Sequence, residues 1–388
     1  MKILVLCHEF PPVGGGGGRV ARDIAVGLAR RGHEIRILTD RLDGLPATET
    51  IEDVHVERIP AGRRAAYRAE FAEMARYDLA AFQAGLRIIR EWKPDVIHAH
   101  FAVPAGAAAY ALSKLTKIPY LLTAHLGDVP GAVPDKTDRW FKLIYPLTPQ
   151  IWKSAARVVA VSEYTRGLAL KHYDVPVEVI HNGVECAALP KWQPSDGSAP
   201  RIIFAGRFVT HKNPTDLVEA LARLAHFPWT CIMAGDGEQL ETVRGLAERH
   251  GLDNRIHLTG WVTPEQVLEH FAASDILVLP SRSEGLSVVG VQGLATGLAL
   301  VLSDAGGNPE LVQPGQNGFL FPAGDVSALS ERLETLLASP EKIAAFQSRS
   351  RELAQDFELG KIISQYEESL EAVIGLPGSK HQGKEIIK

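Results

Sequence analysis

Short, unbroken apolar runs recur along this chain, and most are followed by a turn and a segment of helical spacing. Residues 2–7 (KILVLC) and 275–280 (DILVLP) are two examples. A run without polar alternation is typical of a strand that is buried on both faces, as in parallel sheets covered by helices. The pattern restarts after residues 187–200, which are rich in Pro, Ser, Gly and Ala and which we interpret as a linker. The sequence therefore predicts an α/β protein with two doubly wound parallel sheets, whose ligand edges face each other across a cleft.

The expected elements follow this alternation. In the first half we expect strands at 2–7, 34–39, 94–101, 119–124, 157–161 and 177–180, and helices at 20–31 and 61–92. In the second half we expect strands at 201–205, 230–235, 256–258, 275–280 and 299–303. The helices expected there are 214–224, 240–250, 287–297, 326–337, 342–357 and 361–374, and a polar tail at 375–388 is expected to be disordered.

Composition excludes several classes of protein. The chain has 388 residues, of which 46% are hydrophobic, so it is long and apolar enough to form two domains with full cores. Charged residues make up 22% and the formal net charge is −5, which does not indicate a nucleic-acid binder. Three cysteines lie far apart, which predicts a reducing compartment. No apolar run approaches 18 residues, so we expect a cytoplasmic protein without a membrane span.

The helix expected at 61–92 carries Arg63, Arg64, Arg68, Arg76, Arg87 and Arg90; it is either solvated or placed against anionic lipid, as a peripheral contact on the inner face of the membrane.

A glycine-rich loop follows the first strand. Gly14 to Gly18 are consecutive, but a dinucleotide fingerprint would need glycine where Arg19 stands, and the Gly-Lys-Ser/Thr of a P-loop is missing. Asp40 ends the second strand, where a dinucleotide fold would place its ribose acid. The five glycines let the backbone come close to a ligand or to the facing domain, and the alternative is a flexible turn.

Two further strands of the first half end in polar residues. His98 and His100 lie on one face of a strand, as a metal pair would require, but no third ligand is apparent, so we expect packing or hydrogen-bonding roles and no metal. His125 follows the strand at 119–124, and Asp128 comes three residues later. A polar pair at the carboxyl end of a parallel strand is a candidate site.

The second half contains an anion site and an acid. Residues 281–297 (SRSEGLSVVGVQGLATG) form a turn and then a small-residue helix whose first amides attract phosphate. Glu284 would repel phosphate, so it either accepts hydrogen bonds from sugar hydroxyls or is a surface acid. Arg207 and Lys212 share one loop and suit a diphosphate, where they would stabilise the charge of a leaving nucleotide; the alternative is two surface cations.

Several motifs resemble those of one large enzyme family. AGRFVTHKN, SRSEGLSVVGVQGLATG and AGGNPELV are similar to the carboxyl-terminal half of the retaining, nucleotide-sugar-dependent glycosyltransferases of GT-B family 4. FPPVGGGGGRV, DVIHAHF, TAHLGD and VIHNGVE resemble its amino-terminal half. The motifs stand in the family's order, and the resemblance covers roughly residues 1–370.

The resemblance implies a division of the chain. Residues 1–187 would form a Rossmann-like acceptor domain, and residues 188–360 a Rossmann-like domain for the nucleotide sugar. Residues 361–375 would form a helix that crosses back to the first domain, and residues 376–388 a tail.

The resemblance also assigns residues to the donor. It implies that Arg207 and Lys212 bind the diphosphate and that Gly15 and Gly16 approach the donor or the acceptor. The remaining donor contacts would come from the backbone near Leu286, Ser287 and Val288, which would meet the phosphates, and from that near Val262, which would meet the base.

Three residues would take catalytic places, and one position departs from the family. His125 would lie beside the transferred sugar, Asp128 towards the acceptor hydroxyl, and Glu284 on hydroxyls of the sugar. Eight residues after Glu284, where the family's second acid usually grips the nucleotide ribose, stands Gln292. A neutral amide makes a weaker hydrogen bond than a carboxylate, so we expect weaker or altered nucleotide selectivity.

The predicted function is retaining transfer of a hexosyl unit from a UDP- or GDP-linked sugar to a hydroxyl of a glycan, lipid-linked or small-molecule acceptor. We expect the reaction to belong to cell-surface polysaccharide or glycoconjugate biosynthesis, to need no cofactor, and to proceed without metal. The alternatives are a nucleotide-sugar epimerase of the same architecture and a degenerate sugar-nucleotide-binding protein. A phosphorylase is disfavoured because no pyridoxal phosphate motif stands out, and hydride transfer because the dinucleotide fingerprint fails.

Overall fold

The chain forms two compact units in the computed structural model, which describes residues 1–66, 69–132, 145–193 and 199–375. The first unit comprises Met1–His181 with the described residues from Gly360 onwards, and the second comprises Asn182–Leu359. The division thus falls between His181 and Asn182, earlier than the boundary expected at 187. Arg68, residues 194–198 of the expected linker and residues 376–388 of the expected tail lie outside the described residues.

The first unit is built on an eight-stranded sheet of order β3-β4-β2-β1-β5-β6-β7-β8. Its strands are β1 (Lys2–Leu6), β2 (Glu34–Leu42), β3 (Thr48–Ile51), β4 (Val54–Arg63), β5 (Val96–His100), β6 (Tyr120–Ala124), β7 (Arg157–Ala160) and β8 (Glu178–Val179). The paired strands are parallel except β3 and β4, which are antiparallel. The strand order reverses between β1 and β5, so the loops that follow these two strands diverge and leave room for a ligand.

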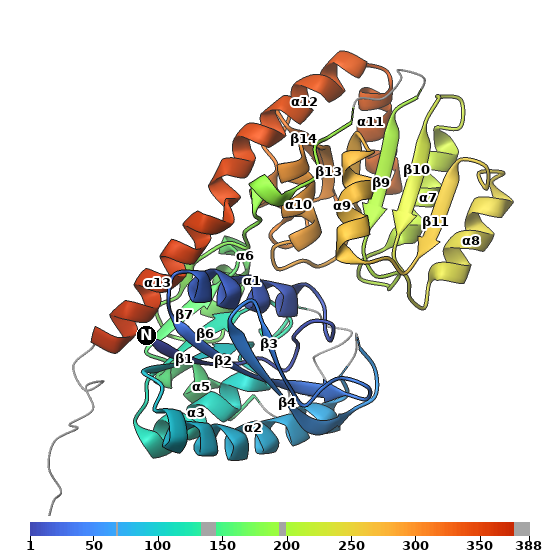
Figure 1. Cartoon of the computed structure of the whole chain (residues 1–388). Coiled ribbons are helices and arrows are strands. Elements are labelled where there is room, and N and C mark those ends of the chain that lie inside the picture. The colour runs from blue at the N-terminus through green and yellow to red at the C-terminus, as the bar shows by residue number, and fades with distance from the viewer. Residues whose placement is uncertain (67–68, 133–144, 194–198, 376–388) are drawn as a thin grey trace, which may run out of the picture. The chain divides into compact units, whose positions relative to one another are not determined.

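Helices cover both faces of this sheet. They are α1 (Gly16–Arg30), α2 (Phe71–Trp92), α3 (Ala105–Thr116), α5 (Thr148–Ser154), α6 (Glu163–Leu170) and α13 (Leu359–Gly375). Side chains of α2, α3 and α5 share one apolar core with β1, β5 and β6, and α1 and α13 lie on the other face (Figure 1). Glu367 holds α13 in place, since its two carboxylate oxygens lie 2.6 Å from His33 Nε2 and 2.6 Å from Arg31 Nη1.

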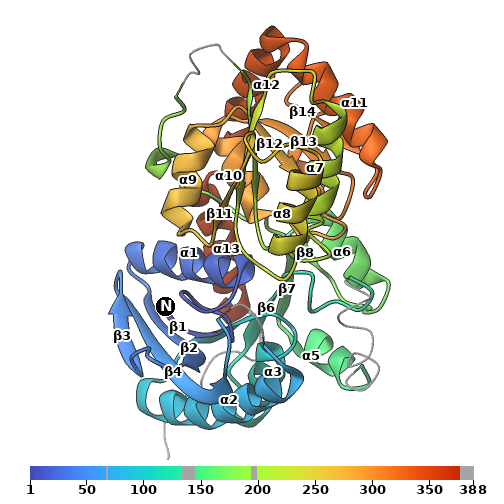
Figure 2. The same ribbon diagram turned by 90° about the vertical axis from the view of Figure 1, so that its right-hand side faces the viewer.

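The second unit is a six-stranded parallel sheet of order β11-β10-β9-β12-β13-β14. Its strands are β9 (Arg201–Ala205), β10 (Thr230–Ala234), β11 (Ile256–Gly260), β12 (Ile276–Leu279), β13 (Ala299–Ser303) and β14 (Gly318–Phe321). Its helices are α7 (Pro214–Arg223), α8 (Leu240–Arg249), α9 (Pro264–Ala272), α10 (Val288–Thr296), α11 (Val326–Leu337) and α12 (Pro340–Leu353). Helices α7, α8 and α11 cover one face, and α9 and α10 the other (Figures 1 and 2). The order of this sheet reverses between β9 and β12.

Helix α10 confirms the most constrained prediction. Ser287 begins it, with its Oγ accepting a hydrogen bond from Gly290 N at 3.1 Å. Gly297 ends it with φ +87°, a conformation that glycine adopts without strain. The capping chemistry and the apolar run before it were both readable from the sequence.

Other predicted elements need correction. The helix expected at 61–92 begins only at Phe71, because residues 61–63 extend the edge of the sheet as part of β4. Helix α1 begins at Gly16 and not at residue 20, so three of the five glycines belong to its first turn. The helix expected at 342–357 is α12, which continues as a short 3₁₀ turn over Ala354–Phe357. The hairpin of β3 and β4, the helices α3, α5, α6 and α9, and strand β14 were not expected.

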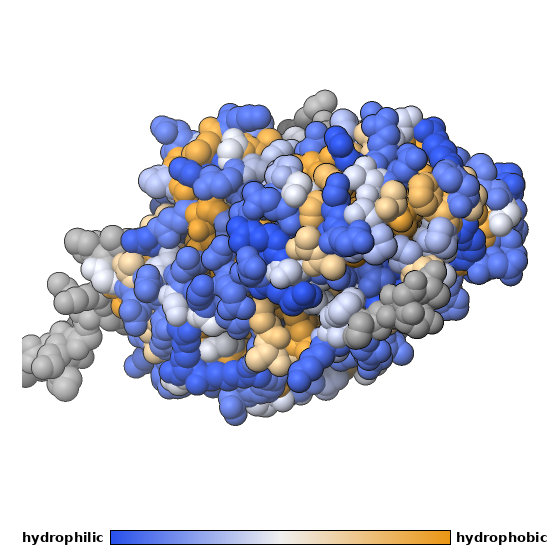
Figure 3. Space-filling model, turned by 90° about the horizontal axis from the view of Figure 1, so that it is seen from above, coloured by the Kyte–Doolittle hydropathy of each residue, from blue (hydrophilic) through white to orange (hydrophobic). Residues whose placement is uncertain are grey.

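The arginines between 61 and 92 do not form one basic face. Arg63 is buried, Arg76 Nε donates to Ala61 O at 2.8 Å, and Arg87 pairs with Glu57. Among the described residues no helix is long and apolar enough to span a membrane. The face of the molecule in Figure 3 is mostly polar, with small hydrophobic patches between the polar residues.

Gly318 provides a test of the second sheet. A Cβ on Gly318 would collide with the backbone oxygen of Leu300, its partner on β13. We expect Gly318→Ala to lower the free energy of unfolding by about 1–3 kcal/mol, because a well-packed site has no room for the extra methyl. Gly245 lies in α8, and the nearest atom to a Cβ there is 3.6 Å away.

Gly245→Ala is the matched control, and it should raise the free energy of unfolding by about 0.5–1 kcal/mol, since alanine favours the helix. Urea titration of both variants measures the effect. Equal stability of the two variants would contradict the packing described for β13 and β14.

Candidate active site

The glycine loop of the first unit packs at the point where its strand order reverses. Gly15 N donates to Glu9 Oε2 at 3.1 Å, and a Cβ on Gly18 would lie only 2.6 Å from the carbonyl oxygen of Glu9. A Cβ on Gly17 would collide with the ring of Phe101, which follows β5. The loop is therefore an ordered close contact and not merely a flexible turn. Gly15 and Gly16 are exposed, so their backbone is open to a ligand.

Asp128 holds two backbone turns. Its Oδ1 accepts hydrogen bonds from His125 N at 2.9 Å and from Leu126 N at 3.1 Å, and its Oδ2 accepts from Ala102 N at 2.6 Å. The carboxyl is 1% exposed, and burial raises its pKa to about 6 although these hydrogen bonds act in the opposite direction. Both oxygens are engaged by backbone amides, which favours a positioning role over the predicted contact with an acceptor hydroxyl.

The two turns that Asp128 holds are strained. Phe101 has φ +71° and Leu126 has φ +106°, both in the left-handed region that side chains other than glycine rarely adopt. Such conformations cost of order 1–3 kcal/mol each and cluster at functional sites. The strain lies on either side of His125, which supports the placement of a site here.

His125 belongs to a buried cluster of imidazoles. His100 Nδ1 lies 3.1 Å from His125 Nε2, and His98 Nε2 lies 2.9 Å from Thr123 Oγ1. Burial lowers the pKa of His98 and of His125 to about 3, and that of His100 well below its usual value. His98 and His100 therefore have the packing and hydrogen-bonding roles that the sequence predicted. The described residues include no group of three or more His, Cys, Asp or Glu side chains arranged to hold a metal ion.

Asp40 is enclosed at the end of β2. It is 1% exposed, and its Oδ2 lies 3.7 Å from Nη1 of the buried Arg63. Burial raises the pKa of this carboxyl to about 7 against the lowering effect of Arg63. An acid in this environment is not open to a ribose, in agreement with the failed dinucleotide fingerprint.

In the second unit, Glu284 and Lys212 meet where the strand order reverses. Lys212 Nζ lies 2.5 Å from Glu284 Oε1, and Ser281 Oγ donates to the same oxygen at 2.7 Å. Glu284 is 7% exposed, which excludes the alternative of a surface acid. Its Oε2 has no hydrogen bond within the described part of the chain and is not enclosed, so it remains available to a ligand.

The loop after β13 packs against the backbone of Glu284. Gly307 N donates to the carbonyl oxygen of Glu284 at 3.1 Å. Gly306 has φ +63°, and a Cβ there would collide with the same carbonyl. Only glycine fits at position 306, which explains the first glycine of the AGGNPELV motif in physical terms.

The start of α10 lies next to this acid. Leu286 O accepts from Asn182 Nδ2 at 2.8 Å, and the Ser287 side chain caps Gly290 N. The amides of Val288 and Val289, the first two of the helix, have no intrahelical partner, as the predicted anion site requires, and that site stays a prediction. Asn182 was missed by sequence reasoning: it stands in VIHNGVE, a motif matched to the amino-terminal half, but it belongs to the second unit.

The other predicted donor residues lie on the same sheet. Arg207 is half-buried and lies two residues after the end of β9, and Arg282 N donates to His211 O at 2.7 Å, which joins the two loops. Gln292 is half-buried, one turn into α10. Val262 is half-buried and follows β11, the edge strand, immediately before Thr263 caps α9.

Comparison with known proteins identifies the family. The profile of Glycosyltransferase Family 4 matches residues 14–188, and that of Glycosyl transferases group 1 matches residues 188–353. The glycogen synthase of Mycobacterium tuberculosis is 30% identical over 384 residues, which cover 92% of this chain and 90% of that protein. This chain is a family 4 glycosyltransferase.

Other relatives agree with this glycosyltransferase in sequence or fold. The N-acetyl-alpha-D-glucosaminyl L-malate synthase of Bacillus anthracis is 24% identical and covers 95% of the chain, with 96% of its own length matched. Sucrose-phosphate synthase from Thermosynechococcus elongatus superimposes with a TM-score of 0.86 at 21% identity, covering 96% of this chain and 99% of that one. The fold is of the GT-B class, with a Rossmann-like sheet in each unit. The transferase prediction is confirmed, and these relatives give no support to an epimerase.

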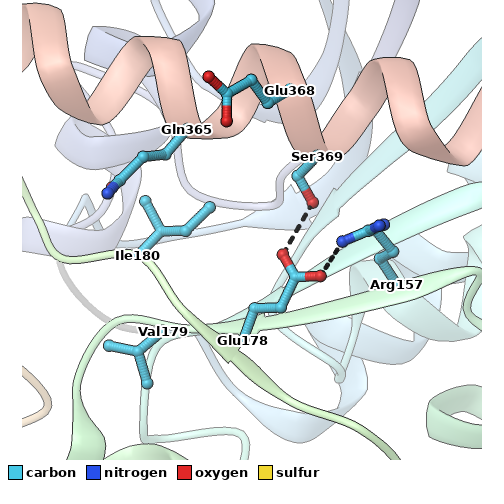
Figure 4. Close-up of a pocket in the computed structure, with 7 residues that line it drawn as sticks. All are labelled: Arg157, Glu178, Val179, Ile180, Gln365, Glu368 and Ser369. Atoms are coloured by element: carbon cyan, nitrogen blue, oxygen red, sulfur yellow. Dashed lines mark hydrogen bonds and ion pairs between the residues drawn. The ribbon is translucent and has the colours of Figure 1, made fainter.

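The glycosyltransferase also has a surface cavity away from the predicted residues. It measures about 310 Å³ and lies between α13, the edge strand β8 and its neighbour β7 in the first unit (Figure 4). Glu178 accepts from Ser369 Oγ at 3.2 Å and pairs with Arg157 across it. None of the predicted site residues lines this cavity.

The buried histidines predict how stability depends on pH. The pKa of His98 is about 3 in the folded protein and about 6.5 in an unfolded chain, so the unfolded chain binds more protons between these values. His98 therefore contributes stability that is fully present above pH 6.5 and is lost as the pH falls towards 3.

We expect the stability advantage of the wild type over His98→Gln to shrink by about 2 kcal/mol between pH 7 and pH 5, because the variant has no imidazole to protonate at this position. Urea titrations of both proteins at the two pH values measure the change. Parallel pH dependences of the two proteins would contradict the neutral, buried state of His98.

Proposed function

We propose that this glycosyltransferase moves a hexosyl unit from a nucleotide diphosphate sugar to a hydroxyl group, with retention at the anomeric carbon. The observation that carries the proposal is the pair of Lys212 and Glu284 beside the start of α10. A cation, an acid and unpaired helix amides lie together at the carboxyl edge of one sheet, which is the combination that a sugar diphosphate needs.

Each part of the nucleotide-sugar donor is assigned a contact with the protein. Arg207, Lys212 and the amides of Val288 and Val289 bind the diphosphate, and Glu284 Oε2 accepts hydrogen bonds from hydroxyls of the sugar. The amide of Gln292 bonds the ribose, and the backbone near Val262 meets the base. HepE from Anabaena, whose structure contains UDP-glucose, superimposes with a TM-score of 0.76 at 23% identity and covers 96% of this chain, with 100% of its own length matched; this supports a UDP-sugar as the first donor to test.

The first unit supplies the acceptor side. We assign the exposed backbone of Gly15 and Gly16 and the ring of His125 to the transferred sugar and the acceptor hydroxyl. Glycan, lipid-linked and small-molecule acceptors all fit a hydroxyl nucleophile. The exposed Arg64 and Arg90 leave room for a peripheral contact with anionic lipid at a cytoplasmic membrane face.

The chemical step follows from the charges. The bond between the anomeric carbon and the phosphate oxygen breaks while the acceptor oxygen bonds that carbon on the same face. The acceptor proton passes to the leaving phosphate oxygen, so no carboxylate nucleophile is needed. Arg207, Lys212 and the start of α10 stabilise the negative charge that develops on the diphosphate. Turnover that EDTA abolishes and Mg²⁺ restores would contradict this distribution of charge.

A ligand-induced thermal shift tests the donor site. We expect one of UDP, GDP and ADP to stabilise the wild type selectively, by about 2.7 kcal/mol at a hundredfold excess over its dissociation constant. Arg207→Ala and Lys212→Ala should lose most of this ligand-induced shift, whereas Arg249→Ala, at an exposed position of α8, should keep it.

The Glu284→Gln variant distinguishes recognition of the sugar from binding of the diphosphate. It should keep the shift with the free diphosphate, because the cations remain, and lose at least tenfold in turnover with the sugar donor. If no diphosphate stabilises the wild type at millimolar concentration, the alternative of a degenerate binding protein gains weight and the donor site assigned above is wrong.

A further inference from the structure

We propose that His100 is a positioning residue that fixes the ring of His125 in the tautomer with the proton on Nδ1. His125 then presents an N–H donor to its ligand and has no free lone pair. The inference rests on the proposed function only in taking the ligand to be the sugar donor or its acceptor.

The His100 ring is packed against two neighbouring imidazole rings. It is fully buried, and its centroid lies 4.1 Å from that of His98 and 5.3 Å from that of His125. His98 is itself bonded to Thr123 Oγ1 and lies 5.6 Å from the buried ring of Tyr366 on α13. The stack therefore runs from α13 to His125, and the orientation of His100 Nδ1 towards His125 Nε2 is set by packing.

Both rings in this hydrogen bond are neutral. Burial lowers the pKa of His125 to about 3 and places that of His100 well below its usual value. A neutral imidazole has one N–H donor and one acceptor nitrogen. The 3.1 Å contact between His100 Nδ1 and His125 Nε2 therefore has two arrangements, which differ in the ring that donates.

The other nitrogen of His100 distinguishes them. His100 Nε2 is buried and has no hydrogen-bond partner within the described residues. If His125 donated, His100 would carry its proton on this nitrogen, as a buried N–H without an acceptor. If His100 donates, Nε2 carries only a lone pair. Orphaned buried donors are rarer in proteins than under-satisfied acceptors, so the arrangement in which His100 donates is favoured.

This arrangement determines what His125 can do. Its Nε2 accepts from His100, so its proton is on Nδ1, which has no hydrogen bond within the described residues and is not enclosed. Nδ1–H can donate to a hydroxyl or phosphate oxygen of the ligand. With one nitrogen protonated and the other engaged, His125 is a poor base, so the proton of the acceptor hydroxyl must leave by another route, such as the leaving phosphate.

The tautomer can be observed directly. Nitrogen-15 NMR of histidine-labelled protein distinguishes a protonated Nδ1 from a protonated Nε2, and His125→Gln assigns the signals. We expect Nδ1–H on His125 in the wild type without any ligand. His100→Phe keeps a ring in the stack but removes the donor, so the nitrogen-15 signal of the unprotonated His125 Nε2 should move to the position of a nitrogen that accepts no hydrogen bond. His100→Asn places an amide donor near the position of Nδ1, and it should preserve the wild-type tautomer.

Turnover should follow this hydrogen bond. We expect kcat to fall about tenfold in His100→Phe, with the KM for the donor within about twofold, and to be largely rescued in His100→Asn. Nε2–H on His125 in the wild type would overturn the proposal, and so would an unchanged His125 Nε2 signal in His100→Phe. The wild-type spectrum decides the question even if the phenylalanine variant does not fold. It also requires no turnover, so a failure of the proposed transferase reaction would be seen separately.

Discussion

The reversal of strand order in each sheet is the constraint on which the rest of this structure depends. Between β1 and β5, and again between β9 and β12, neighbouring parallel strands lead into helices that continue on opposite sides. The loops at these two points separate, whereas loops elsewhere along the edge pack against each other. The glycine loop lies at the first reversal, His125 follows the next strand, β6, and Lys212 and Glu284 lie at the second reversal. The topology of the two sheets thus determines where the candidate site residues lie, whatever their side chains.

Burial then determines what the charged groups at these edges can do. Glu284 is nearly enclosed, and an unpaired carboxylate in that position would be strongly unfavourable. Lys212 and Ser281 stabilise one of its oxygens and leave the other open. The same cation can face a diphosphate, because an ammonium group has three donors. In the proposed function, one contact therefore serves both the stability of the loop and the recognition of the donor.

In the first unit, burial keeps the histidines at the sheet edge neutral. The histidines of β5 and β6 are kept uncharged by their surroundings, so they act as directional hydrogen-bonding groups. Asp128 is an acid at this edge, and the backbone amides of two strained turns engage it. A residue that the sequence placed towards the acceptor is better understood as the support of the loop that carries His125.

The sequence by itself determined the fold class, most of the strands of both cores, the bounds of α10 and the residue types from which the donor site is proposed. These depend on local properties: apolar runs, turn residues and the order of motifs along the chain. It could not determine that Asn182 supports Leu286, that Arg63 is buried in β4, or that Asp128 is engaged by Ala102. Those facts arise from contacts between segments far apart in the sequence. Only the tertiary structure decided them, because a side chain's role depends on which donors, acceptors and apolar surfaces the fold brings within reach, and no local pattern records that.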